Sequence, residues 1–327
     1  MHISAQRAAS QTTPALPPPP PLPVIVIAHE SASTAIGPLH PERIDGLVRV
    51  ARGVYAEAEA WKAMRPAERH RLLIEAVRRT DDEAVLVGPS AAIAYGIPVV
   101  GMRLERVEVL RRQASRSRTT LMRRRHRAGN LDIVEHGGLL LASAADAAVD
   151  IARWGGLIPG VCAMDSALHQ ELCVWEELRE ALERIPAGSR GLRVARTALG
   201  LADERAESPG ESVSRVRQWQ GHLPQPVLQY VLDAGGRVIR VDFYWASINL
   251  VGEYDGRIKY DPASFGRDTR AVLLDEKDRQ NELEDLYGVI VRRWGWNDAW
   301  YHDGAAMIEC LVRAGLEQMP APWPLRA

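Results

Sequence analysis

Alternating apolar and polar positions mark a run of short strands in the C-terminal third of the chain. Residues 238–245 and 250–255 are rich in β-branched and aromatic residues and flank a break, and residues 226–232 have the same character. The Asp-Ala-Gly-Gly turn at 233–236 predicts a hairpin between residues 226–232 and residues 238–245. Residues 289–294 predict a further, buried strand.

Acidic residues lie within these predicted strands. Because alternate residues of a strand share a face, Glu253 and Asp255 should point to the same side as Val251. If the strands pair as antiparallel neighbours, Asp242 comes close to Glu253. Three carboxylates would then crowd one sheet edge, which is costly unless a cation neutralises them. Carboxylate oxygens favour Mg²⁺ (or Mn²⁺) over zinc, so Asp242, Glu253 and Asp255 are candidate metal ligands.

Helical periodicity dominates the middle of the chain. Apolar residues spaced three or four apart predict helices at 67–79, at 144–153, at 162–185 with a break near Val174, at 188–201 and at 275–286. Two segments before residue 100 have a different pattern. Residues 43–55 predict a helix end followed by a β-hairpin wing, and residues 85–98 predict a turn at Pro89-Ser90 followed by a short apolar helix.

The first forty residues differ from the rest. They are rich in Ser, Thr, Ala and Pro and contain five consecutive prolines, so they predict a disordered tail. We expect four parts: this tail (1–40), a region with the wing and a basic hairpin (41–135), a helical connector (136–204) and a C-terminal domain (205–327).

Composition limits the class of protein. Almost half of the residues are apolar, enough for real cores, and the formal net charge is −1, so the total charge indicates no partner. The three cysteines lack paired spacing, which is typical of a reducing cytoplasm. No apolar run approaches the roughly 20 residues that span a bilayer, so we expect a cytoplasmic protein without a membrane partner.

Charge is nevertheless concentrated in one stretch. Residues 103–127 hold ten arginines and two acids, Glu105 and Glu108. We expect a strand at 106–110, an arm at 111–118 and a returning strand at 121–127. Arginines at this density attract phosphate oxygens, although a solvated hairpin is the alternative. The candidate nucleic-acid contacts are Arg111, Arg112, Arg116, Arg118, Arg123, Arg124, Arg125 and Arg127 of this stretch, and Arg279 of the C-terminal domain.

Glu211 has two competing interpretations. Ser208 predicts a helix N-cap, Pro209 suits the first helical position and Glu211 lies three residues after Ser208, which is a capping box. A carboxylate on this helix could equally face the Asp242 strand and join the metal site.

These motifs together resemble the core of the PD-(D/E)XK nucleases, and in particular the domains related to very-short-patch-repair endonucleases. The matching pieces are, in order, E-S-P-G-E-S (207–212), R-V-D-F (240–243), L-V-G-E-Y-D-G (250–256), D-E-K-D-R (275–279) and G-V-I-V-R-R-W (288–294). The resemblance implies an α/β, restriction-endonuclease-like C-terminal domain with a mixed sheet flanked by helices. It also implies that Glu211 is a further catalytic carboxylate.

One position departs from that family pattern. The usual Lys two residues after the acidic position is Asp255 here. A cation would have to come from another element, with Lys277 preferred over Lys259 and with Arg279 near it, unless Asp255 helps to bind a second metal.

Residues 43 to about 205 resemble abortive-infection antitoxins of type IV. The matching residues are L-V-R-V-A-R-G-V-Y (47–55), P-S-A-A-I-A-Y-G-I-P (89–98) and A-A-D-A-A-V-D-I-A-R (144–153). The resemblance implies a winged-helix-like and helical α+β N-terminal region. A complete helix-turn-helix before the wing is absent, because the proline-rich tail occupies that place.

The sequence therefore predicts a metal-dependent endonuclease that hydrolyses DNA phosphodiesters. The resemblances imply phage defence or a toxin–antitoxin-like system with a partner protein. The alternative is a DNA-binding antitoxin or transcriptional regulator with an inactive nuclease-like fold. Trp294, Trp296 and Trp300 are expected in packing, with base stacking as the alternative.

Overall fold

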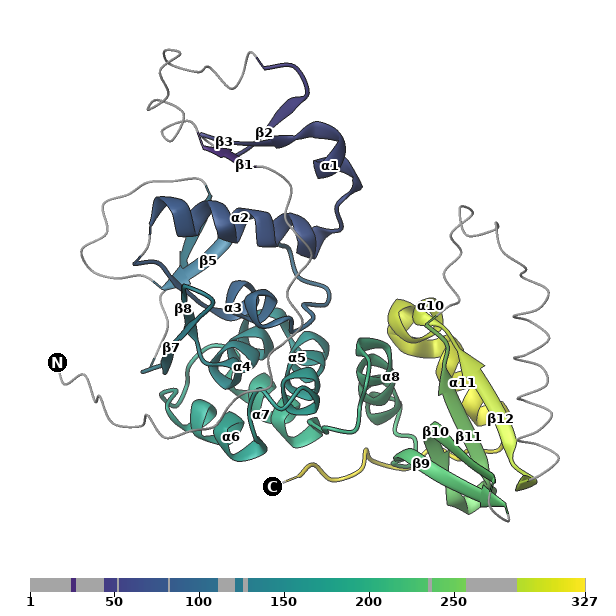
Figure 1. The fold of residues 1–327 in the computed structure, drawn as a ribbon. Helices are drawn as coiled ribbons and strands as arrows, with labels where there is room; N and C mark the ends of the chain where they lie inside the picture. Colours follow the sequence, from purple (N-terminus) through teal and green to yellow (C-terminus); the bar gives the residue numbers. More distant parts are fainter. Residues whose placement is uncertain are drawn as a thin grey trace.

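The computed structural model describes most of the chain, in eight segments. These are residues 25–27, 44–51, 53–81, 83–110, 121–125, 129–234, 237–256 and 287–326. In Figure 1, the elements before helix α8 (Pro209–Gln220) form one body, the elements after it form a second, and α8 lies between the two. No helix in these segments is long and apolar enough to cross a membrane.

A small antiparallel sheet contains the predicted wing. Strands β2 (Leu47–Ala51) and β3 (Val54–Glu57) form the hairpin, and the turn uses Gly53 at φ +75°. Strand β1 (Ile25–Ile27) pairs with β3 on its other side. The prediction that residues 1–40 are wholly disordered is therefore wrong at β1, where three consecutive β-branched residues add an edge to the sheet.

A second sheet has the strand order β6-β5-β4-β8-β7. Its strands are β4 (Val85–Leu86), β5 (Val107–Leu110), β6 (Met122–Arg125), β7 (Ile133–His136) and β8 (Leu139–Ala142). Strands β5 and β6 are parallel, so the predicted basic hairpin is wrong. A hairpin needs antiparallel strands, whereas parallel neighbours need a connection that carries the chain back to the starting edge.

Seven helices of the described segments surround these sheets. They are α1 (Ala58–Ala63), α2 (Pro66–Thr80), α3 (Gly88–Tyr95), α4 (Ala144–Gly155), α5 (Leu157–His169), α6 (Trp175–Glu183) and α7 (Leu192–Leu201). The three helices predicted between residues 144 and 201 are four, because the break near Val174 separates α5 from α6.

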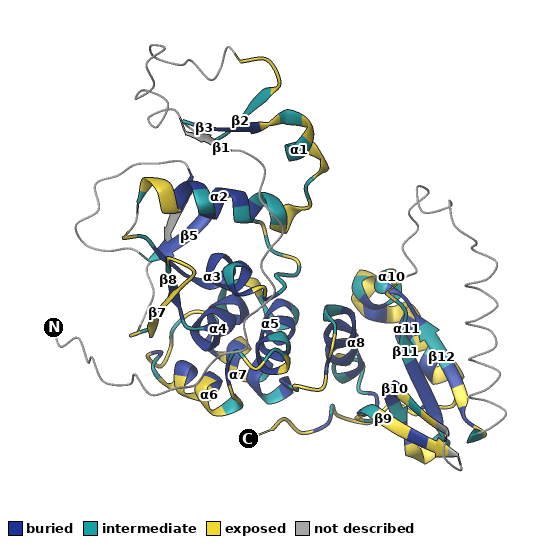
Figure 2. Ribbon diagram, viewed as in Figure 1, coloured by how far each residue is buried: buried dark blue, intermediate teal, exposed yellow. Residues whose placement is uncertain are grey.

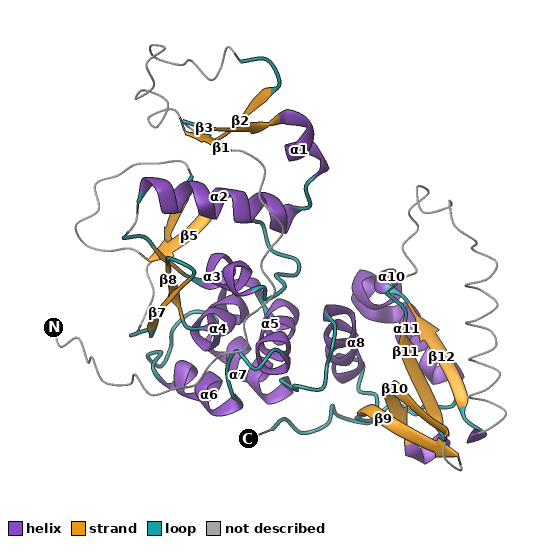
Figure 3. Cartoon of the chain, viewed as in Figure 1, coloured by secondary structure: helices purple, strands orange, loops and turns teal. Residues whose placement is uncertain are grey.

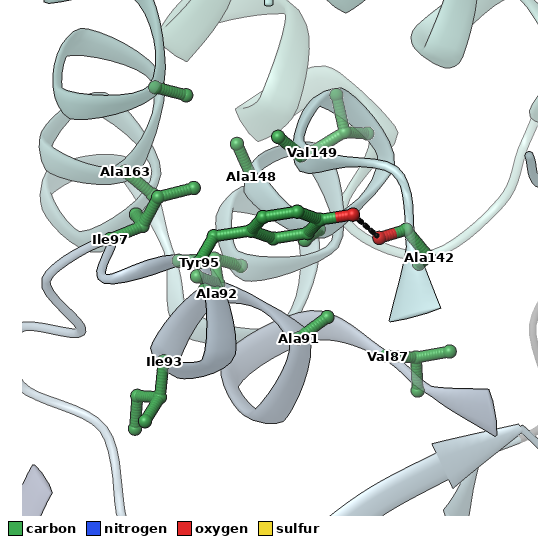
Figure 4. Packing of buried hydrophobic residues seen from close by; sticks show 14 of the residues in the cluster. Val87, Ala91, Ala92, Ile93, Tyr95, Ile97, Ala142, Ala148, Val149 and Ala163 are labelled. Atoms are coloured by element: carbon green, nitrogen blue, oxygen red, sulfur yellow. Dashed lines mark hydrogen bonds between the residues drawn. The ribbon is translucent and has the colours of Figure 1, made fainter. Parts of the chain in front are cut away.

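One hydrophobic core joins the wing, the second sheet and these helices. It runs from Val54 to Ala202 in the sequence and includes Val216 of α8 and Trp323 near the C-terminal end. Figure 4 shows part of it, where the hydroxyl of Tyr95 donates to the carbonyl of Ala142 at 3.2 Å. The predicted boundary between residues 135 and 136 falls inside β7, an edge strand of the second sheet.

The C-terminal body is built on a four-stranded sheet of order β12-β11-β10-β9 (Figure 3). The strands are β9 (Val227–Ala234), β10 (Arg237–Trp245), β11 (Leu250–Tyr254) and β12 (Ile290–Trp294). The first three are antiparallel in succession and β12 is parallel to β11, which confirms the predicted strands and a mixed sheet. A 3₁₀ turn (Ala246–Ile248) forms the predicted break. Helices α10 (Trp296–Trp300) and α11 (Ala305–Arg313) follow β12, joined by a 3₁₀ segment (Tyr301–Gly304).

Helix α8 is buried on both sides (Figure 2). Towards α5, Arg215 forms an ion pair with Asp165 at 2.5 Å, and both side chains are almost fully buried. Arg215 also donates to the carbonyl of Leu201, and Asp165 accepts from the Asp203 amide at 2.8 Å. Towards the sheet, Trp294 donates to the hydroxyl of Ser214 at 2.7 Å. The two bodies thus share one helix.

Arg215→Met is expected to lower the free energy of unfolding by about 3–5 kcal/mol, because Asp165 is left as a buried charge without its cation. The double variant Asp165→Asn/Arg215→Met should recover a large part of this loss, because Asn can still accept from the Asp203 amide. Urea unfolding measures both. The control is Arg313→Met, which breaks the exposed Arg313–Glu309 pair and should cost about 1 kcal/mol or less. A neutral Arg215→Met would show that the pair does not hold α8.

Candidate functional site

Strands β9 and β10 change face where Gln229 lies opposite Asp242. Val241 packs in the cluster on one side of the sheet, whereas Phe243 packs in the cluster on the other, although a regular strand would put both on one face. Pairing is recorded at Val241–Tyr230 and at Phe243–Leu228, on either side of this position. Gln229 has φ +50°, a conformation that side chains other than glycine rarely adopt. Such strain is most often found at functional sites.

Asp242 lies where β10 and β11 part. Main-chain pairing between these strands ends at Phe243–Gly252. Beyond that pair, the Asp242 carboxylate accepts the backbone N–H of Tyr254 at 2.8 Å. The side chain of Asp242 thus takes the place of a main-chain partner, which holds its carboxylate in the gap between the strands.

Glu253 is the next acid along β11 and has a cationic partner. It lies beside Arg293 of β12 in the parallel register, and the two side chains form an ion pair at 2.7 Å. Both are largely buried, at 12% exposed for Glu253 and 20% for Arg293. The antiparallel pairing of β10 and β11 brings Glu253 near Asp242, as the sequence predicted.

Glu211 takes part in the start of α8 and also contacts the sheet. Its amide donates to the Ser208 hydroxyl at 3.2 Å, and that hydroxyl donates to Glu211 Oε1 at 2.6 Å, so the predicted cap is formed. Its other oxygen, Oε2, accepts from the Glu207 amide at 3.1 Å and from Gln229 Nε2 at 2.9 Å. One carboxylate therefore caps α8 with one oxygen and faces the sheet with the other.

The electrostatics join three acids into one cluster, Glu211, Asp242 and Glu253, hereafter the carboxylate cluster. Burial, together with the charges of Glu211 and Glu253, raises the pKa of Asp242 to about 6. Hydrogen bonds from the Tyr254 amide and from Gln229 oppose this shift. Gln229 therefore bridges Glu211 and Asp242, and the three acids come from a helix and two strands.

Asp255 lies one residue beyond β11, where its amide donates to the Trp294 carbonyl at 2.9 Å. Its charge affects Tyr254: burial raises the pKa of the Tyr254 phenol, and the negative charges of Asp255 and Glu211 also raise it. The Tyr254 ring occupies the space over Gly210, where a Cβ would lie 2.0 Å from a ring carbon. This contact fixes the first turn of α8 against β11.

Other predicted residues fall outside the described segments. These are Lys259, Lys277, Arg279, Arg111, Arg112, Arg116, Arg118 and Arg127. Arg123, Arg124 and Arg125 lie on β6, of which only the backbone is described. The tryptophans pack as expected: Trp294 is buried, and the rings of Trp296 and Trp300 stack with centroids 5.1 Å apart.

The sequence interpretation missed Gln229 and Arg293 as members of the site. Gln229 carried no signal, because an amide in the middle of an apolar strand predicts neither a positive φ nor a bridging role. Arg293 carried a weak one, because Arg292 and Arg293 follow three apolar residues at the end of a predicted strand in the stretch that resembles the nucleases.

The donor set fits a hard divalent cation in its chemistry. The carboxylate cluster supplies only oxygen atoms, and crowding of like charges is what such a cation would relieve. Within the described segments, no three His, Cys, Asp or Glu residues already stand in a metal-holding arrangement. Arg293 and Gln229 occupy carboxylate oxygens of the cluster, and a cation would compete with them.

Comparison with known proteins places the chain in a family. Uncharacterized protein MT2308 of Mycobacterium tuberculosis (strain CDC 1551 / Oshkosh) is 31% identical to it over 248 residues, which is 75% of this chain and 84% of that protein. Uncharacterized protein Rv2248 of Mycobacterium tuberculosis (strain ATCC 25618 / H37Rv) matches with the same values. The chain belongs to the family of these two proteins. Because 248 residues exceed the length of either part beside α8, the shared sequence includes both. No family model and no solved structure matches the chain.

Asp242→Asn is expected to change how stability depends on pH. A carboxylate with a raised pKa in the folded state stabilises the fold below its unfolded pKa of about 4, and this contribution is lost as the pH rises to about 6. The variant should therefore gain on the wild type by up to about 3 kcal/mol in free energy of unfolding between pH 4 and pH 7.

Urea unfolding at a series of pH values measures this difference. The matched control is Glu317→Gln, which removes an exposed carboxylate of the same body. A constant difference between Asp242→Asn and wild type at all pH values would contradict the raised pKa.

Proposed function

We propose that this protein is a metal-dependent endonuclease that hydrolyses DNA phosphodiester bonds at the carboxylate cluster. The observation that carries the proposal is the convergence of Glu211, Asp242 and Glu253 from three elements at the point where β10 and β11 part. Burying like charges together is costly, and a bound divalent cation would offset the repulsion among the three acids.

The order of the elements supports the same proposal. A helix carrying Glu211, a hairpin carrying Asp242, a strand carrying Glu253 and a strand ending near Arg293 follow one another, as in the PD-(D/E)XK nucleases that the sequence resembles. The mixed sheet, with β12 parallel to β11, has the layout that we propose to be restriction-endonuclease-like.

The residues of the cluster have distinct tasks in this proposal. Asp242 and Glu253 would hold Mg²⁺ or Mn²⁺, with Glu211 and Asp255 as further ligands or partners of its bound waters. Such a cation supplies an acidified water and neutralises charge at the phosphate. Asp242 must be ionised to serve as a ligand, so we expect activity to rise with pH through about 6. Gln229 keeps Glu211 beside Asp242, and Arg293 orients Glu253.

The second candidate is a non-catalytic DNA-binding antitoxin or regulator. One observation favours it: each acid of the cluster already has a partner within the protein, namely Arg293, the Tyr254 amide or Gln229. In either case, the sequence resemblance to abortive-infection antitoxins supports a proposed role in cytoplasmic phage defence or in a toxin–antitoxin-like system with a partner protein.

Asp242→Asn and Glu253→Gln should each abolish DNA cleavage that depends on Mg²⁺ or Mn²⁺, with no loss of DNA affinity in chelator. Plasmid and single-stranded DNA, each with either metal or with chelator, provide the measurement. Glu207→Gln is the matched control, because Glu207 is a neighbouring acid that pairs with exposed Arg240. Wild-type cleavage rates in either cluster variant would reject the site, and a wild type that cuts no DNA would favour the regulator.

Arg293→Met should lower the turnover rate about 10²-fold with substrate affinity little changed, since it removes the cation that neighbours Glu253. Lys277→Met, tested in parallel, probes the cation that the sequence favoured. If Lys277→Met lowers turnover and Arg293→Met does not, then Arg293 only balances the charge of Glu253.

A further inference from the structure

Helix α7 presents an arginine stripe on its outer side. Its buried side packs Leu192, Ala195, Ala198 and Leu199 into the main core. The stripe consists of Arg190, just before the N-cap, and Arg193 and Arg196 on the helix, and all three are exposed. Residues three apart are neighbours on a helix surface, so Arg193 and Arg196 lie on one side of α7, and Arg190 lies in the turn that leads into the same helix.

These arginines lack the partners that arginines of other helices have. Glutamates one turn away pair with Arg65 and Arg78 of the α2 region, with Arg179 of α6 and with Arg313 of α11. Within the described residues, no hydrogen bond or ion pair joins Arg190, Arg193 or Arg196 to an acid. The sequence has no acid between Glu183 and Asp203 that could serve. The stripe therefore has free donors and an unbalanced charge.

The position of the stripe is unfavourable for the helix itself. Cations at a helix N-terminus oppose the macrodipole, and Arg190 and Arg193 lie at that end of α7. Helices α2, α4, α6 and α8 carry an acid in the first turn, whereas α7, like α3, α5 and α11, carries none. Stability does not explain this arrangement, but an anionic partner would be attracted by both the arginines and the dipole.

The stripe lies within reach of the carboxylate cluster. Seven residues lead from the end of α7 at Leu201 to the N-cap of α8 at Ser208, which limits that distance to about 25 Å. Arg196 is about another 8 Å back along α7. One turn of duplex DNA, about 34 Å long, could therefore reach from Arg196 to the start of α8.

We propose that Arg190, Arg193 and Arg196 bind the phosphate backbone of duplex DNA and hold it beside the carboxylate cluster. This inference rests on the proposed function for the choice of polymer, but it does not require cleavage. Guanidinium groups on an exposed helix contact phosphates without reading bases, so binding should be independent of sequence.

The test is the triple variant Arg190→Ser/Arg193→Ser/Arg196→Ser of the full chain. Its affinity for two unrelated 30-base-pair duplexes is measured by fluorescence anisotropy in chelator, over a series of salt concentrations. Wild type should bind both, and the variant should bind both at least about tenfold more weakly. The slope of log affinity against log salt should fall by up to about three.

Two further variants separate the stripe from charge in general and from misfolding. Arg78→Ser/Arg179→Ser/Arg313→Ser removes the same charge from arginines that have glutamate partners, and should leave the slope unchanged. Arg190→Lys/Arg193→Lys/Arg196→Lys keeps the charge and should keep most of the slope. An equal loss in the paired-arginine control, or an unchanged slope in the serine variant, would overturn the stripe.

Failure of the proposed function has a different outcome. If wild type binds duplex DNA through the stripe and never cleaves it, the stripe stands and the nuclease does not. If wild type binds no duplex at low salt, the proposal that the stripe binds DNA is rejected.

Discussion

The buried ion pair between Asp165 and Arg215 is the interaction on which the C-terminal body depends. A buried charge is costly without its counter-charge, so separating α8 from α5 would leave each partner of this pair uncompensated. Arg215 also donates to the carbonyl of Leu201 at the end of α7, which ties the pair to the main core. The contacts between α8 and the C-terminal sheet therefore depend on where this ion pair holds the helix.

Helix α8 transmits that position to the carboxylate cluster through three contacts. Ser214 accepts a hydrogen bond from Trp294, Gly210 admits the ring of Tyr254, and Glu211 accepts one from Gln229. Each contact requires the helix to lie close to the sheet. The left-handed conformation of Gln229 costs about 1–3 kcal/mol and persists because packing on both sides of the switch fixes the strands. Packing of the two strands thus maintains the strained backbone of Gln229 and, with it, the bridge between Glu211 and Asp242.

The sequence was informative where local rules decide the structure. Alternation predicted the strands around Asp242 and Glu253, and Ser208 predicted the start of α8 because capping is local. Long-range features escaped it. Strand β6 runs parallel to β5, and nothing in the sequence of residues 121–127 indicates that direction. Strand β1 pairs with β3, which lies well beyond it in the sequence. The bridge through Gln229 depends on a backbone conformation that the packing of two strands imposes, so its amide carried no pattern to recognise.

A net charge near zero hides a separation of charge that the fold creates. Arginines without glutamate partners line α7, whereas acids gather where α8 meets β10 and β11. A polyanion drawn to the first surface would be repelled by the second, because buried carboxylates are poorly screened by salt. A divalent cation at the carboxylate cluster would remove that repulsion. Under the proposed function, the cation would therefore supply the chemistry and would also admit the phosphate to the site, which makes close approach of DNA dependent on metal even before any bond is cut.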